Sequence, residues 1–285
     1  GVAVRVFDAM PSLGRKFLLA GRGGLNLTHS EPEPRFLARF GAREPQLAPL
    51  LRRFGARELR AWADELGART FVGSSGRVFP ADMKAAPLLR AWLRRLHALG
   101  VRWHVRHRFA GWAGDGALLL ATPGGEARVA ARAVVLALGG ASWPRLGSDA
   151  AWVPVLAARD VAVAPLKSAN CGFDVRGPGG LPGWSPFFAE RHAGQPLKTV
   201  ALRCEGFERR GEFVVTATGV EGSLIYAASA LLRDAIEARG EATLHLDLLP
   251  DRTAEQVRAA ALHPRGARSV ASHLKGRLGL QGVKM

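Results

Sequence analysis

A segment rich in glycine and basic residues lies near the start of the sequence, at residues 14–30 (GRKFLLAGRGGLNLTHS). Its charges are Arg15, Lys16 and Arg22, and such groups bind phosphate through charge-assisted hydrogen bonds. Four glycines, at which backbone amides can approach an anion without side-chain obstruction, are interspersed with them: Gly14, Gly21, Gly23 and Gly24. This composition is too basic and glycine-rich for an ordinary helix or strand and suits a pyrophosphate. Spacing alone leaves an exposed loop equally open, because neither a P-loop nor GxGxxG is present.

A β-branched run precedes this segment and ends at an acidic residue. Residues 2–7 (VAVRVF) predict a strand that finishes at Asp8. In a dinucleotide-binding βαβ unit, a carboxylate at the end of the second strand binds a ribose hydroxyl, about 20 residues after a glycine-rich fingerprint. Asp8 is therefore a candidate ribose ligand, with a plain turn residue as the alternative. We expect that fingerprint, with its strand and helix, to precede residue 1, so that the sequence is a fragment.

A second glycine pair follows an apolar run. Residues 133–138 (AVVLAL) predict a strand buried on both faces of a parallel sheet, and Gly139 and Gly140 close it. The two glycines could form only a tight turn. The carboxyl edge of such a strand is, however, also where α/β sheets meet ligands.

A third glycine-rich stretch begins at residue 211 (GEFVVTATGVEGSLIY), where a strand breaks into glycines before a helix. Five of its residues are candidates to face a substrate or a ring: Thr216, Gly219, Glu221, Gly222 and Tyr226. The alternative is a strand-to-helix turn capped by Ser223. Lys198 and Cys171 are further candidates, for which structural roles are more common. The sequence contains no HExxH, no GxSxG and no evident acid pair, so we predict no metal site and no hydrolase chemistry.

The net charge of +16 raises the question of nucleic-acid binding. Only six of the 40 basic residues are lysines, and the arginines are spread along the whole chain, so the bias reads as compositional and we do not expect nucleic acid as a partner. The two cysteines, Cys171 and Cys204, form no CxxC pair, which favours a reducing compartment. Apolar runs stay below the ~18 residues that a membrane helix needs. We therefore expect a cytoplasmic protein without a membrane partner.

The 285 residues exceed a typical single domain. Periodicity predicts these elements: short helices over 34–66 with breaks at Gly41 and Gly55, a hairpin over 70–79, a helix over 86–99 capped at Gly100, a strand over 101–105, a hairpin over 117–129 and a helical region over 251–275 capped by Thr253. From about residue 148, short β-type segments separated by proline and glycine predominate. We divide the chain into an α/β domain of dinucleotide-binding type that lacks its first βα unit (1–148), a β-rich insert (149–250) and the start of a helical subdomain (251–285).

Four separated motifs together resemble one known family. They are residues 14–30, 71–80 (FVGSSGRVFP), 137–144 (ALGGASWP) and 215–222 (VTATGVEG). The sequence is similar along almost its whole length to the bacterial FAD-dependent oxidoreductases of the aminoacetone-oxidase-like, or YhiN-type (BaiN/RdsA-type), flavoprotein family. The resemblance implies an α/β fold, in which a Rossmann-like FAD/NAD(P)-binding domain carries an inserted β-rich domain and a small helical subdomain.

By that likeness, Asp8 would bind the adenosine ribose. The residues that would line the flavin and its pyrophosphate are Arg15, Lys16, Gly21, Gly23, Gly24 and Asn26. Phe109, at the end of the strand after Gly100, would meet the adenine through its backbone, and Gly139 and Gly140 would form a second nucleotide-contacting segment. The family's first GxGxxG unit and its last glycine-rich segment are not found in the sequence, and Ala150 stands where the family leads us to expect glycine. We therefore expect residues 1–285 alone to bind FAD poorly.

The implied activity is an FAD-dependent oxidation or reduction of a small molecule, linked to NAD(P)H or to oxygen. Candidates for a general acid or base are, in order, Glu221, Tyr226 and Lys198, to be judged by their distance from the flavin ring. Two alternatives stay open: a flavin-dependent protein that modifies or associates with RNA, and an FAD-binding protein without catalytic activity. The sequence leaves the substrate and the oligomeric state undetermined.

Overall fold

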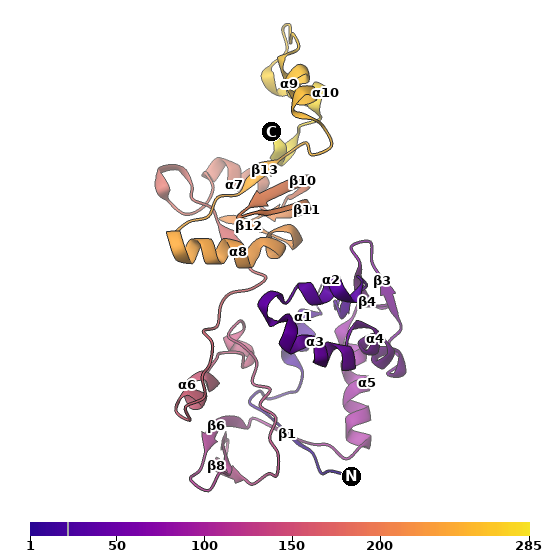
Figure 1. The fold of residues 1–285 in the computed structure, drawn as a ribbon, viewed down its shortest axis with the longest axis vertical. Helices are drawn as coiled ribbons and strands as arrows, with labels where there is room; N and C mark the ends of the chain where they lie inside the picture. The colour runs from indigo at the N-terminus through magenta and orange to yellow at the C-terminus, as the bar shows by residue number, and fades with distance from the viewer. Residues whose placement is uncertain (22) are drawn as a thin grey trace. The chain divides into compact units, whose positions relative to one another are not determined.

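The computed structural model describes residues 1–21 and 23–285, and the chain forms two compact units, unit 1 (Gly1–Leu166) and unit 2 (Lys167–Met285) (Figure 1). Our division at residues 148 and 250 rests on composition and stays a prediction. The elements of unit 1 are β1 (Arg5–Asp8), α1 (Arg15–Ala20), β2 (Thr28–His29), α2 (Glu33–Ala38), η1 (Gly41–Arg43), α3 (Glu44–Arg53), α4 (Ala56–Glu65), β3 (Thr70–Val72), β4 (Arg77–Pro80), α5 (Ala85–Ala98), β5 (Arg102–Val105), β6 (Arg108–Trp112), β7 (Leu118–Thr122), β8 (Gly125–Val129), η2 (Pro144–Leu146) and α6 (Trp152–Ala157).

The helical region predicted over 34–66 is confirmed, including its two breaks. Gly41 begins the turn η1, and Gly55 caps α4, where its amide donates to the Glu58 carboxylate at 3.1 Å. The predicted hairpin is also confirmed, because β3 pairs antiparallel with β4. The helix expected over 86–99 is α5, and Gly100 follows it with φ +79°.

The first half of the glycine-rich segment is helical, contrary to our expectation. Residues 15–20 form α1 because their apolar side chains can be buried: Phe17 packs against a core cluster that includes Ala63 of α4 and Leu88 of α5. Gly14 caps this helix with φ +69°. Burial of one apolar face therefore outweighs the basic composition of the segment.

The strand predicted at the start of the chain is confirmed as β1, which pairs in parallel with β5. The register places Phe7 opposite His104 and Asp8 opposite Val105. The Phe7 and His104 rings stack with their centroids 4.7 Å apart, and the ring centroid of His107 lies 5.5 Å from that of His104. The Nε2 atom of His104 is buried without a hydrogen-bond partner. Burial, followed by the charge of His107, lowers the pKa of His104 below its ordinary value.

The buried strand predicted at residues 133–138 is wrong. The structure leaves this run outside any strand, and Val135 is 91% exposed. A parallel strand is buried on both faces only where neighbouring strands hydrogen-bond to it and helices cover it. Within 1–21 and 23–285, β1 and β5 form a two-stranded sheet that does not include this run.

A three-stranded meander, β6-β7-β8, contains the predicted hairpin over 117–129. Its first strand was not anticipated, and it changes the place of Phe109. That residue lies in β6, paired with Leu120 of β7, and not at the end of the strand after Gly100, which ends at Val105. The positive φ of Arg106 (+57°) turns the chain out of the β1–β5 pair before β6 begins.

Unit 2 contains β9 (Phe173–Asp174), η3 (Pro178–Gly180), α7 (Pro186–His192), β10 (Pro196–Cys204), β11 (Phe207–Val215), β12 (Gly219–Glu221), α8 (Ser223–Arg239), β13 (His245–Asp247), α9 (Ala254–Leu262), α10 (Val270–Leu278) and η4 (Gly282–Lys284). Its antiparallel sheet has the order β13-β10-β11-β12-β9, and α8 lies along one face of it (Figure 1). Leu202 of β10 and Ile225 of α8 are fully buried between these layers. The predicted Thr253 cap is confirmed at the start of α9, with Gln256 completing a capping box.

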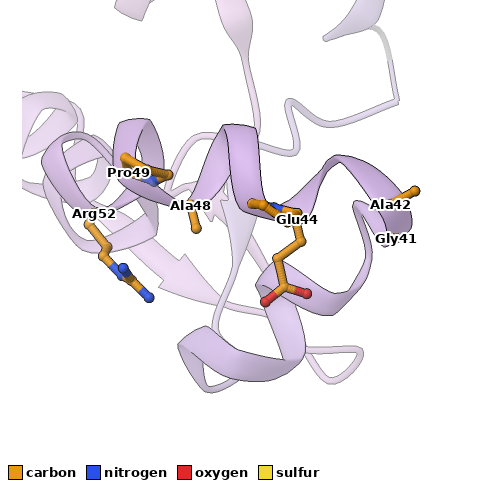
Figure 2. Close-up of a pocket in the computed structure, with 7 residues that line it drawn as sticks. Gly41, Ala42, Glu44, Ala48, Pro49 and Arg52 are labelled. Carbon is orange, nitrogen blue, oxygen red and sulfur yellow. The ribbon is translucent and has the colours of Figure 1, made fainter.

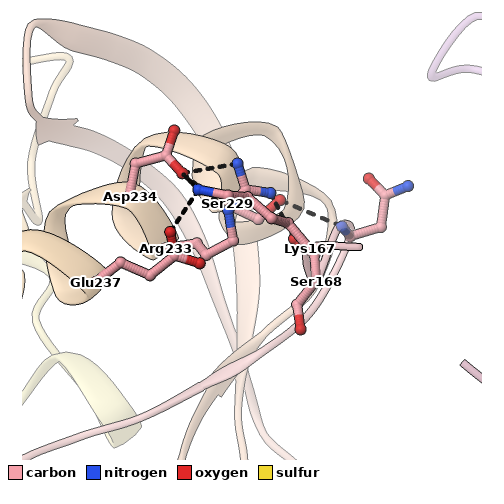
Figure 3. A network of polar contacts seen from close by, with 7 residues as sticks. Lys167, Ser168, Ser229, Arg233, Asp234 and Glu237 are labelled. Atoms are coloured by element: carbon pink, nitrogen blue, oxygen red, sulfur yellow. Dashed lines mark hydrogen bonds and ion pairs between the residues drawn. The ribbon is translucent and has the colours of Figure 1, made fainter. Parts of the chain in front are cut away.

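The first residues of unit 2 are held to α8 by a polar network (Figure 3). The Lys167 ammonium pairs with Asp234 and Glu237, and the Arg233 guanidinium donates to the Ser168 carbonyl at 2.7 Å. The Asn170 amide donates to the Ser229 hydroxyl at 3.2 Å, and Ser229 is 4% exposed. These contacts hold residues 167–170 against α8. In the part of the chain that the structure describes, no helix has the length and apolar character to cross a bilayer.

Protonation of His104 should destabilise unit 1. Because folding lowers its pKa below the ordinary value of 6.5, the unfolded chain takes up the proton first, and stability is lost as the pH falls below 6.5. His104→Phe can keep a ring beside Phe7 but cannot be protonated, so the variant should lose less stability on acidification. Thermal unfolding of both proteins from neutral to mildly acidic pH measures this difference. Parallel pH profiles would contradict the expectation.

Ala150→Gly should stabilise the fold. Ala150 has φ +58°, a left-handed conformation that costs a residue with a Cβ about 1–2 kcal/mol, and the entropy of glycine in the unfolded chain offsets part of the gain. We expect the free energy of unfolding to rise by about 1 kcal/mol, measured by denaturant titration. The matched control is Ala151→Gly, because Ala151 has φ −59° and needs no glycine. An equal or larger gain in the control would show that backbone strain at Ala150 is not the cause.

Candidate functional site

The ammonium group of Lys16 joins two of the predicted cofactor-binding segments. It lies 3.1 Å from the Ser142 hydroxyl and 3.3 Å from the Ser148 hydroxyl, although these serines are more than 120 residues away in the sequence. The Ser148 hydroxyl also accepts a hydrogen bond from the Gly140 amide at 3.1 Å. Lys16 thus lies beside the second glycine pair. Among the ion pairs of the described residues, none involves Lys16.

Asp8 lies close to the same loop. One carboxylate oxygen accepts a hydrogen bond from the Met10 amide at 2.8 Å, which matches the turn role that we kept as the alternative. The Met10 side chain in turn packs against Gly147, where a Cβ would lie 3.1 Å from its sulfur. The structure therefore brings Asp8, Lys16 and the 139–148 loop into one neighbourhood at the carboxyl end of β1.

Further hydrogen bonds hold the glycine pair in place. The indole nitrogen of Trp152 donates to the Gly139 carbonyl at 3.0 Å, and the Ala150 amide donates to the Gly140 carbonyl at 3.0 Å. Asp149 accepts from the Ala151 amide and pairs with Arg108 at 3.1 Å, and these contacts lower the pKa of Asp149. The loop that carries Gly139 and Gly140 is thus fixed at both of its ends.

Most glycines of the first segment have a packing role in the structure. A Cβ at Gly14 would lie 2.6 Å from Leu89 of α5, one at Gly21 would lie 2.4 Å from the Cβ of Ala85, and one at Gly24 would lie 2.5 Å from Met83. These glycines let α1 and the following turn approach α5 closely. Their predicted contact with a pyrophosphate stays a prediction.

Three further candidates of the segment are exposed to solvent. Gly23 is exposed, with open space around its α-carbon, and Asn26 and Arg15 are exposed as well. These three positions are therefore accessible to solvent. Arg22 lies outside the residues that the structure describes.

Phe109 is next to Arg108, whose guanidinium reaches Asp149 of the loop. Its ring packs edge-on against Trp112, with centroids 4.9 Å apart. The strand β6 begins close to Asp8, because the amide of His107, the residue before β6, donates to the Asp8 carbonyl at 2.9 Å. The predicted backbone contact with an adenine stays a prediction.

The candidates for acid or base chemistry all lie in unit 2. Glu221 ends β12 and is exposed, and Tyr226 lies half-buried in the first turn of α8. Between them Gly222, with φ +108°, is the cap of α8, so Ser223 is the first helical residue and not the cap. Lys198 is exposed within the irregular part of β10, between Leu197 and Val200. The structure brings Glu221 and Tyr226 to one strand-to-helix turn, where neither side chain has a hydrogen bond to the described residues.

Of the two other candidates, Thr216 has a structural explanation. The Thr216 hydroxyl accepts a hydrogen bond from the Gly219 amide at 2.8 Å and so closes the turn between β11 and β12. Cys171, by contrast, is a half-buried free thiol to which the structure assigns no structural role, and Cys204 is free as well. In 1–21 and 23–285, no cluster of three or more histidine, cysteine, aspartate or glutamate side chains could hold a metal.

The sequence did not single out Ser142 and Ser148, the two serines that contact Lys16, as site residues. Both lie in the stretch after the second glycine pair, but a serine next to glycine is common in turns and carries no further signal. What sets Ser148 apart is burial, since it is 3% exposed, and burial depends on the tertiary fold.

Unit 1 also has a shallow hollow of about 430 Å³ over η1 and α3. Glu44 and Arg52 extend from the same side of α3, with Ala48 between them (Figure 2). Alanine and proline form most of the remaining lining, and none of the predicted site residues lies there. The hollow therefore offers little convergent chemistry.

Comparison with known proteins identifies the family. The model of the HI0933-like protein Rossmann domain matches residues 1–262. The chain is also 26% identical over 266 residues to the 3-dehydro-bile acid delta(4,6)-reductase of Clostridium scindens. That alignment covers 90% of this chain and 61% of the relative's length.

The family model covers all four motifs from which the resemblance was drawn, so the resemblance and the α/β, Rossmann-like fold class are confirmed. Within that fold, the candidate site lies at the carboxyl end of the parallel β1–β5 pair, where Asp8 is found. The chain belongs to the HI0933-like protein Rossmann domain family.

Proposed function

We propose that the protein is an FAD-dependent oxidoreductase that acts on a small molecule. Membership of the Rossmann family supports a dinucleotide cofactor, and the reductase from Clostridium scindens, though distant, supports redox chemistry. We further propose NADH or NADPH as the electron donor, on the resemblance to the flavoprotein family; the name of the reductase relative does not specify a donor.

The observation that carries the proposal is the position of Lys16. Its ammonium is held by two hydroxyl groups beside the glycine pair, with no carboxylate to neutralise it among the ion pairs of the described residues. An ammonium in this setting retains its affinity for an anion, and a phosphate supplies the strongest hydrogen-bond acceptors available to it. The neighbouring glycines leave space, since nothing lies within 4 Å of a Cβ built at Gly140.

The residues present fit FAD in their chemistry. Asp8 offers a carboxylate oxygen beyond the one that accepts from Met10, and a ribose hydroxyl is a suitable donor to it. Lys16 would bind the pyrophosphate, and Gly139 and Gly140 would allow close approach of the backbone. The exposed Arg15, Gly23 and Asn26 are accessible to other parts of the cofactor.

FAD, when bound, would supply the capacity to accept and donate a hydride. The chain's own residues would bind and orient the cofactor in unit 1. In unit 2, the Glu221 carboxylate and the Tyr226 hydroxyl share one turn, where either could hold a proton for the substrate. Lys198 is the third candidate for this role.

Removing the charge of Lys16 should weaken FAD binding. A hydrogen bond to a charged group contributes about 1.5–3 kcal/mol, so Lys16→Ala should raise the Kd for FAD by about tenfold to a hundredfold. Quenching of flavin fluorescence during titration of the protein measures this ratio, even where binding is weak. The control is Lys275→Ala, which removes an equal charge from an exposed position on α10. Equal losses in the two variants would attribute the effect to net charge and would contradict a site at Lys16.

Reduced nicotinamide should bleach the bound flavin. With FAD supplied and oxygen excluded, we expect NADH or NADPH to abolish the flavin's visible absorbance, because hydride transfer to the ring disrupts its conjugation. Stopped-flow absorbance with each donor gives the rate and the preference between them. Bleaching by dithionite but by neither nicotinamide would disprove the NAD(P)H link and leave oxygen-linked chemistry.

A further inference from the structure

Unit 2 contains a cavity of about 630 Å³ that neither the proposed FAD site nor the acid and base candidates use. Its lining includes Phe213 and Val220, which are buried side chains of the sheet, and Leu232 and Ile236 of α8. Volumes of about 300–1,000 Å³ are typical of sites for small organic ligands. Well-packed protein interiors, by contrast, have few voids larger than a water molecule.

Aromatic rings form one part of the cavity lining, beside the side chains of valines and leucines. Trp184 and Phe188 pack together with their centroids 4.8 Å apart, and Phe173 lies on the same lining. The Trp184 indole nitrogen donates to the Gly219 carbonyl at 3.1 Å, so the polar atom of this ring is already satisfied. These rings offer a ligand an aromatic surface within an otherwise aliphatic lining, and aromatic surfaces favour flat ring systems.

The wall is held in shape by its backbone. The Val175 amide donates to the Thr218 carbonyl at 3.0 Å, and the Gly183 amide donates to the Val175 carbonyl at 2.8 Å. A Cβ at Gly219 would lie 1.9 Å from the Phe173 carbonyl, so only glycine permits this approach of β12 to β9. A wall fixed in this way needs little reordering when a ligand binds, which lowers the entropic cost of binding.

The charged residues of the lining come from two chain segments, one at the end of β9 and one after α8. Arg176, which follows β9, pairs with Glu241, which follows α8, and Asp174 lies two residues from Arg176. All three are exposed, while Phe213, Val215 and Leu232 deeper in the cavity are each 2% exposed. The Arg176–Glu241 pair cancels its own charge, and the Asp174 carboxylate, which accepts a hydrogen bond from the Thr218 hydroxyl, leaves one negative charge that disfavours an anionic ligand. The lining thus combines an apolar interior with a polar, solvent-exposed edge.

We propose that this cavity is a binding site for a flat, uncharged and mainly apolar ring compound, whose polar end lies at the edge formed by Arg176 and Glu241. The assignment rests on the size, the aromatic wall and the fixed backbone of unit 2, and it is independent of FAD binding in unit 1. The Arg176–Glu241 pair links the two segments on either side of this edge.

Binding of the uncharged fluorescent probe N-phenyl-1-naphthylamine tests the site. The unaltered protein should bind one probe molecule saturably, with enhanced fluorescence. Ala242→Trp places a large ring in the cavity lining and should weaken binding by about tenfold or more. The matched control is Ala227→Trp, an exposed position of α8 that does not line the cavity. It should bind the probe as the unaltered protein does.

Thermal unfolding separates loss of the site from loss of the fold. A tryptophan that fills the cavity should keep or raise Tm, because it buries apolar surface where solvent was. If Ala242→Trp lowers Tm strongly, Ile236→Trp replaces it, since Ile236 lines the cavity and is 36% exposed. The proposal is overturned if the unaltered protein shows no saturable binding, if the folded cavity variant binds the probe as tightly as the unaltered protein, or if the control loses affinity equally.

Discussion

The candidate site of unit 1 depends on one ammonium group. Lys16 projects from α1 to two serine hydroxyls of the 139–148 loop, which lies outside the strands and is otherwise held by hydrogen bonds to Gly139 and Gly140. The contact is polar and partly exposed, so it contributes little to stability by itself. Its importance is positional, because it brings a positive charge and the second glycine pair to the end of β1 where Asp8 lies. Without it, α1 would lose its hydrogen bonds to the 139–148 loop.

The glycines of the first segment show how one residue type can serve two purposes. Gly14, Gly21 and Gly24 are needed where they are because a Cβ would collide with Leu89, Ala85 and Met83 respectively. Packing alone therefore explains them, and a cofactor is not required to account for their presence. Close packing of α1 on α5 also fixes the direction of Lys16, so the structural role and the proposed binding role are compatible.

Unit 2 has a different physical basis. Its sheet and α8 enclose a continuous apolar core, and the network around Lys167 secures the first residues of the unit to α8. The same core opens into the cavity beside the aromatic wall. The strand-to-helix turn at Gly222, which needs its positive φ, places Glu221 and Tyr226 together. Unit 2 thus contains both the apolar cavity and the residues that we propose for acid or base chemistry.

Local patterns in the sequence determined most of the elements. The helices over 34–66, the hairpin of β3 and β4, the cap of α5 at Gly100 and the Thr253 capping box follow from periodicity and from turn residues, which act over a few neighbours. The family also follows from the sequence, because four spaced motifs carry it. The sequence likewise identified Asp8, Lys16 and the second glycine pair as candidates.

Only the tertiary structure decided the outcomes that depend on distant partners. Residues 15–20 became a helix because α4 and α5 bury Phe17, and residues 133–138 stayed exposed because no strand pairs with them in the described chain. Ser148 is buried and lies 3.3 Å from the Lys16 ammonium, and Phe109 lies in β6, which begins after the chain turns at Arg106. In each case the free energy comes from contacts between residues far apart in sequence, and local propensity carries no information about them.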